Sequence, residues 1–142
     1  MRRILTRGVL TASGAILALI GGALMFSPKA FLETSQVFID HDPGLMSELT
    51  APSGVLIVTG AMMILGAFKL RYVNLALSIG AIVYGSYGFG RLVSMGLHGL
   101  PSETLITATV IECAVAVVLL VLRLSPSKPV ISQTDPLKCS TV

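Results

Sequence analysis

Two ionisable side chains, Arg91 and Glu112, lie inside long apolar stretches of the sequence and are the residues best placed to do chemistry. A lone charge in an apolar medium is costly, so such residues usually pair and often mark a proton, ion or ligand site. A helical rise of about 1.5 Å per residue puts Arg91 about 11 Å below His98 and Glu112 about 14 Å below Glu103. These depths, on consecutive helices joined by a tight turn, predict an Arg91–Glu112 pair. The pair is either a structural clamp between helices or part of a functional site.

Arg91 belongs to a polar stripe whose members follow one another at spacings of three and four: Tyr84, Tyr87, Arg91, Ser94 and His98. This spacing places them on one face of a helix. In a membrane that face meets protein or a wet cavity, so two interpretations stay open. The hydroxyls either bond to neighbouring backbone groups or line a pocket that opens outward. In the second case Glu48 forms the rim and Thr109, one turn before Glu112, faces the same way.

The chain that must position these residues is strongly apolar, with 54% hydrophobic and 12% charged residues among 142. A soluble domain of this length carries about twice that share of charge. A membrane-spanning helix needs about 20 apolar residues. Four stretches satisfy this: 8–26, the segment between Glu48 and Lys69, 73–97, and 104–122. We therefore predict an all-α fold, a bundle of four transmembrane helices in the lipid bilayer.

The loop between the first two spans is long enough for structure of its own. Ser27-Pro28 is typical of a helix start, and residues 29–38 mix apolar and polar side chains as a short interfacial helix does. Asp42-Pro43 repeats the start signal before the second span. Residues 1–124 are thus expected to form the transmembrane domain, and residues 125–142 a disordered cytoplasmic tail.

The charged residues sort to two sides of the membrane. One side has Arg2, Arg3, Arg7, Lys69, Arg71, Arg123, Lys128 and Lys138, whereas the other has Lys29 as its one Lys or Arg, with Glu33, Asp40, Asp42, Glu48 and Glu103. The positive-inside rule then predicts a cytoplasmic (inner) membrane protein with both termini cytoplasmic. Because the basic residues flank apolar segments and form no patch with aromatic neighbours, no nucleic-acid partner is expected.

Other potentially reactive groups lack the patterns that chemistry requires. His41 stands between Asp40 and Asp42, but no metal-ligand spacing links it to His98 or Glu103, so no metal site is expected. Cys113 lies in an apolar run and is interpreted as a packing residue. The sequence has no nucleophile–base arrangement and no nucleotide, phosphate or haem motif. We therefore expect neither a cofactor nor an enzyme.

The chain resembles the bacterial four-helix membrane family catalogued as domain of unknown function 4345. The resemblance covers about residues 8–124. The residues that carry it are Pro28, Phe31, Glu48-Leu49, Gly54, Tyr84 through Gly90-Arg91, Gly99, Pro101 and Glu112. The sequence departs from the family pattern at two places. It has Thr50 where the family often has an arginine, and it lacks the acidic residue that the family favours near His98. The resemblance implies four helices and no established activity.

Two functional hypotheses remain. The first is a small accessory or assembly subunit of a membrane complex, whose partners are other membrane-protein subunits or further copies of the chain. It rests on small size, minimal loops and glycine-rich helix faces. The second is a binder or carrier of a small or lipophilic molecule at the Arg91–Glu112 site. A cavity that reaches Arg91 from outside would favour the second hypothesis, and a dry pair beside a lipid-facing glycine groove would favour the first.

Overall fold

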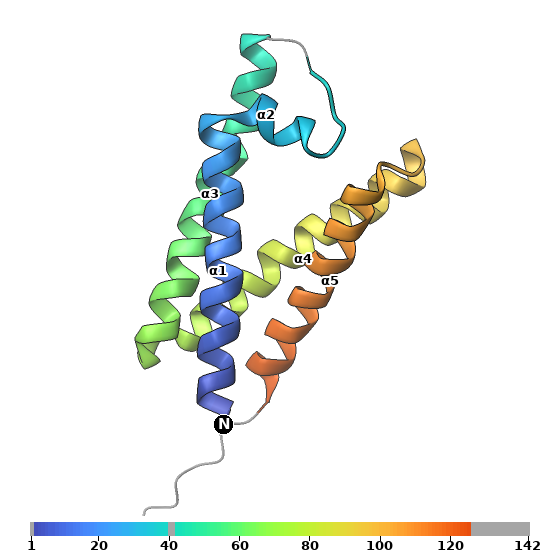
Figure 1. Cartoon of the computed structure of the whole chain (residues 1–142). Helices are drawn as coiled ribbons and strands as arrows, with labels where there is room; N and C mark the ends of the chain where they lie inside the picture. Colours follow the sequence, from blue (N-terminus) through green and yellow to red (C-terminus); the bar gives the residue numbers. More distant parts are fainter. Residues whose placement is uncertain (1, 40–41, 126–142) are drawn as a thin grey trace, which may run out of the picture.

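The computed structural model describes residues 2–39 and 42–125, and this part of the chain folds into helices joined by loops, with no strand (Figure 1). Its elements are α1 (Arg2–Phe26), α2 (Pro28–Glu33), α3 (Pro43–Phe68), the 3-10 turn η1 (Leu70–Tyr72), α4 (Val73–His98) and α5 (Glu103–Leu124). Within the described residues, α1, α3, α4 and α5 are long and apolar enough to cross a membrane. The predicted four-helix fold is confirmed, and a short helix, α2, occupies the long loop.

Local sequence accounts for the helix ends that frame the site. The Leu45 amide donates a hydrogen bond of 2.8 Å to Asp42 Oδ1, and Pro43 follows at the first position of α3. A side-chain acceptor at this position satisfies an otherwise unpaired amide of the first turn. In the second half of the chain, α4 ends at His98. Gly99 follows with a φ of 92°, a left-handed conformation that suits a residue without Cβ.

The helices associate as two antiparallel pairs, α1 with α3 and α4 with α5 (Figure 1). Glycines allow the close approach in both pairs. A Cβ on Gly60 of α3 would lie 2.5 Å from the Gly14 carbonyl oxygen of α1, and a Cβ on Gly88 of α4 would lie 2.7 Å from Cys113 Sγ of α5. Gly22 differs from Gly14 and Gly21 of the same helix, because no atom lies within 4 Å of its Cβ position.

The two pairs join along the first half of α4. Met63 of α3 packs against Gly80, and the Tyr84 hydroxyl donates a hydrogen bond of 2.8 Å to the Ser13 carbonyl of α1. Tyr84 is 3% exposed and belongs to the hydrophobic core with Leu10, Leu17, Leu56, Met63, Ala67, Ala76, Leu77 and Leu119. This core lies where α1, α3 and the first half of α4 meet, and α5 contributes Leu119 to it.

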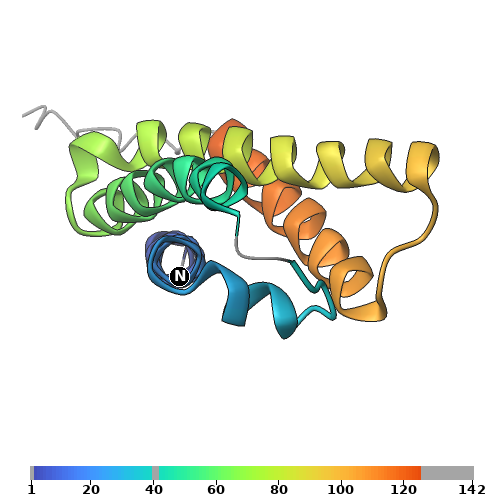
Figure 2. The same cartoon turned by 90° about the horizontal axis from the view of Figure 1, so that it is seen from above.

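Beyond Tyr84 the α4–α5 pair diverges from the α1–α3 pair, toward the end of the molecule that holds α2 (Figures 1 and 2). From Phe89 to His98 every residue of α4 is exposed except Arg91 and Met95, which are half-buried. The chain after α2 crosses to α5, where the Ser102 hydroxyl donates a hydrogen bond of 2.9 Å to the Ser35 carbonyl. The second half of α4 is therefore left without a helix on its α3-facing side.

Candidate functional site

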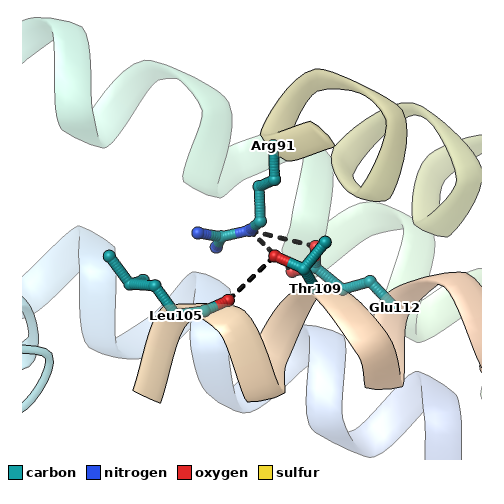
Figure 3. A network of polar contacts seen from close by, with 4 residues as sticks. All are labelled: Arg91, Leu105, Thr109 and Glu112. Carbon is teal, nitrogen blue, oxygen red and sulfur yellow. Dashed lines mark hydrogen bonds and ion pairs between the residues drawn. The ribbon is translucent and has the colours of Figure 1, made fainter. Parts of the chain in front are cut away.

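Arg91 of α4 and Glu112 of α5 are in direct contact (Figure 3). Arg91 Nε donates to both carboxylate oxygens, at 3.0 Å to Oε2 and 3.3 Å to Oε1. The side chain of Glu112 is 16% exposed and that of Arg91 is 34% exposed. The carboxylate is thus enclosed between the helices, whereas part of the guanidinium reaches the surface.

The contact leaves most of the guanidinium's donors unused. A guanidinium carries five N–H donors, and Glu112 takes the one on Nε. The two terminal nitrogens extend away from Glu112 (Figure 3) and donate to no side chain or carbonyl within residues 2–39 and 42–125. Arg91 therefore offers four N–H donors in a fixed planar fork that the carboxylate holds in place.

These donors border a groove on α4. The groove has a volume of about 380 Å³ and is lined by Ser86, Tyr87, Gly90, Arg91 and Ser94. The residues lie at spacings of three and four, so they share one face of α4, in the half of the helix beyond Tyr84. The groove is open along its length, and it reaches Arg91 from the surface.

The groove also holds hydroxyl groups without partners. Within the described part of the chain, the hydroxyls of Ser86, Tyr87 and Ser94 form no hydrogen bond. Elsewhere in the helices, hydroxyls do bond to a carbonyl of the preceding turn, as Thr107 does to Glu103 at 2.9 Å. The local hydroxyl-to-backbone bonds that would make these groups inert are absent at the groove.

Two residues of the predicted site have structural roles beside it. Tyr84 points away from the groove and ties α4 to the Ser13 carbonyl. Thr109 is 3% exposed and donates at 2.8 Å to the Leu105 carbonyl (Figure 3). The interpretation that stripe hydroxyls satisfy backbone groups therefore holds for Tyr84, and it does not hold for Tyr87 and Ser94.

Glu48 and His98 are exposed at the α2 end of α3 and α4 and do not line the groove. Neither forms an ion pair with Arg91 or Glu112. That Glu48 forms the rim of a pocket and that His98 belongs to its polar lining stay predictions.

Sequence reasoning missed Ser86 and Gly90. Ser86, Gly90 and Ser94 follow one another at a spacing of four, which places them on one face of a helix. This face lies next to the polar stripe, and the spacing could have identified it. Which of two adjacent faces becomes a groove depends on where α3 leaves α4, and no local pattern reveals that.

Three further predictions concern residues elsewhere. Asp40, His41 and residues 126–142 of the tail, with Cys139, lie outside the described residues. Among those that are described, no group of three His, Cys, Asp or Glu side chains could hold a metal ion. Cys113 is free, and its sulfur packs against Gly88.

Comparison with known proteins places this architecture within a family. No curated protein and no solved structure matches the chain. One family model does match, and it covers residues 5–123, which include α3, α4, nearly all of α1 and α5, and both members of the Arg91–Glu112 contact. The chain belongs to the family described as domain of unknown function DUF4345.

Proposed function

We propose that this protein binds the polar head of an amphipathic molecule in the groove on α4, with Arg91 as the principal donor. The observation that carries the proposal is the set of unpartnered donors around the groove: the terminal nitrogens of Arg91 and the hydroxyls of Ser86, Tyr87 and Ser94. Glu112 orients the guanidinium and neutralises its charge. The proposal contains no chemical step and therefore no catalytic residue.

The cost of unsatisfied polar groups in lipid supports the proposal. Ser86 lies about 18 Å and Ser94 about 6 Å from the end of α4 at His98, at about 1.5 Å per residue, which is the depth of one leaflet. At that depth each polar group without a hydrogen-bond partner costs several kcal/mol, so a partner is expected from outside the protein chain.

The dimensions and surroundings of the groove also suit a small amphipathic ligand. The groove, of about 380 Å³, is shallow and open, so a ligand held there by its head would keep its tail in the lipid. Val83 and Leu97 continue the same face of α4 on either side, by their spacing from Tyr87 and Ser94. Polar groups at the centre with apolar residues at both ends match a molecule that has a polar head and an apolar tail.

The distribution of basic residues supports a location of this groove in the outer leaflet. Arg3, Arg7, Lys69, Arg71 and Arg123 are all exposed at the other end of the helices. The positive-inside rule puts that end in the cytoplasm, so the groove opens to the outer leaflet of a cytoplasmic membrane.

Blocking the groove tests the proposal. Gly90 and Gly96 are both on α4, and no atom lies within 4 Å of the Cβ position of either. Gly90→Leu would fill the groove, while Gly96→Leu adds the same side chain on another face. Both variants are purified in mild detergent, and bound small molecules are identified by native mass spectrometry. A species retained by wild type and Gly96→Leu and lost from Gly90→Leu is expected. Equal retention of the bound species by both variants would contradict the proposal.

An accessory or assembly subunit is the second candidate. It is favoured by the same exposed run of small residues, Ser86, Gly90 and Ser94, whose spacing of four permits close packing of another transmembrane helix. In this case the species lost from Gly90→Leu would be a protein or a second copy of the chain. The purification described above distinguishes the two candidates.

A further inference from the structure

The charge balance of the groove points to the chemistry of the head that it receives. We infer that the groove selects lipids with an uncharged, oxygen-rich head, bearing hydroxyl or carbonyl groups, over lipids with an anionic head. This inference rests on the proposed function and specifies its ligand.

The ion pair has already neutralised the site. Arg91 is the one cationic side chain lining the groove, and Glu112 lies 3.0 Å from it. An anionic head would leave the assembly of Arg91, Glu112 and ligand with a net negative charge in a medium of low dielectric constant. A net charge there is costly, whereas an uncharged head adds acceptors without adding charge.

The donors that remain are suited to neutral acceptors. The terminal nitrogens of Arg91 can only donate, and the hydroxyls of Ser86, Tyr87 and Ser94 can donate and accept. A carbonyl or hydroxyl oxygen of the ligand can accept from Arg91, and a ligand hydroxyl can also donate to the serines. A cationic ammonium head has no acceptor to offer the guanidinium, so it would leave the terminal nitrogens of Arg91 without a partner.

The surroundings of the groove disfavour anions further. At the α2 end of the molecule the described residues include four carboxylates, Glu33, Asp42, Glu48 and Glu103, and one Lys or Arg, Lys29. Their summed field is negative, and it lowers the local concentration of anionic heads. Both the Arg91–Glu112 pair and the surrounding surface therefore disfavour the binding of an anionic head.

Access from the lipid completes the argument. The bond between Ser102 and the Ser35 carbonyl ties the segment after α2 to the start of α5, on the water-facing end of the helix pairs. Ser86, Gly90 and Ser94 are exposed along the side of α4, and Tyr87 and Arg91 are half-buried. A ligand that is already dissolved in the leaflet reaches the groove sideways, without crossing this end.

Two lipids with identical tails test the selectivity: dioleoylglycerol, whose head is an uncharged hydroxyl, and dioleoylphosphatidic acid, whose head is anionic. Binding of each to purified protein in detergent is measured by native mass spectrometry, for wild type and for Gly90→Leu. Dioleoylglycerol is expected to bind wild type at least about tenfold more tightly than phosphatidic acid, in keeping with the cost of a net charge in lipid. The difference is expected to vanish in Gly90→Leu.

A variant that changes the net charge of the Arg91–Glu112 pair gives a second, independent test of the selectivity. Glu112→Gln keeps the shape of the side chain and leaves Arg91 with a net positive charge, so preference should shift toward phosphatidic acid. Tighter binding of phosphatidic acid to wild type, dependent on Gly90, would overturn the inference and leave the proposed binding function standing. If neither lipid binds in a Gly90-dependent manner and no species is lost from that variant on purification, both the inference and the proposed function are wrong.

Discussion

At the scale of single residues, neighbouring members of the polar stripe have different roles: some bond within the protein and others border the groove. Tyr84 and Tyr87 are three residues apart on α4, yet the Tyr84 hydroxyl bonds to α1 and the Tyr87 hydroxyl borders the groove. Arg91 combines both roles, since its Nε is held by Glu112 and its terminal nitrogens extend away from Glu112. The stripe therefore contains structural and ligand-facing groups side by side.

The two tyrosines make a matched pair of variants. Tyr84→Phe removes the hydrogen bond to Ser13 and is expected to cost about 0.5–1.5 kcal/mol of stability, the usual net value of one such bond. Tyr87→Phe removes a hydroxyl without a partner in the described chain, so thermal stability in detergent should be unchanged while retention of the bound species falls. Equal loss of stability in both variants would contradict these different roles.

The Arg91–Glu112 contact predicts energetic coupling. Arg91→Leu leaves a carboxylate without a partner, and Glu112→Leu leaves a guanidinium without one, so each single change is destabilising. The double variant has neither charge, and it should be less destabilised than the sum of the single changes by about 1–3 kcal/mol. Thermal unfolding in detergent across the four proteins measures this coupling. Additive effects would mean that the two side chains do not interact.

The sequence could predict a contact of the site only where the two residues lie on neighbouring segments of the chain. Arg91 and Glu112 could be matched because they lie on consecutive helices joined by a four-residue turn, 99–102, so that helical rise alone sets their relative depth. The Tyr84–Ser13 bond joins residues 71 positions apart, and no local spacing indicates it. Ser86 and Gly90 escaped prediction for the same reason, since a distant helix decides their exposure.

At the scale of helices, glycines set how closely the pairs approach. Gly60 faces the backbone of α1, with a Cβ position 2.5 Å from the Gly14 carbonyl oxygen, and backbone cannot move aside as a flexible side chain can. Gly14 and Gly60 thus make the close contact between α1 and α3, and Gly22 has no part in it.

Gly60→Ala should therefore destabilise the α1–α3 pair by about 1–3 kcal/mol, the usual cost of overpacking. Gly22→Ala inserts the same methyl group into open space and serves as the control. Its stability should equal or slightly exceed that of wild type, because alanine favours helix over glycine. A lowered unfolding temperature for both variants, or for neither, would contradict the packing described for this pair.

At the scale of the whole molecule, the four long helices and the distribution of charge define an orientation that labelling can check. Gln36→Cys lies after α2, and Lys69→Cys lies between α3 and α4, in a background with Cys113 and Cys139 replaced by serine. A membrane-impermeant thiol reagent added to intact cells should modify position 36 alone, because four spans put the two positions on opposite sides. Modification of position 69 alone would reverse the orientation, and modification of both would contradict four spans.

The binding claim is tested most directly by photocrosslinking in a bilayer. A diacylglycerol with a diazirine close to its head is incorporated into vesicles with the protein, irradiated, and its attachment sites are mapped by mass spectrometry. The account predicts adducts concentrated on residues 86–94 of α4 and lost in Gly90→Leu, but preserved in Gly96→Leu. Adducts spread evenly over exposed apolar positions such as Ile82, Val110 and Val117, and equal in both variants, would show that the groove binds no ligand.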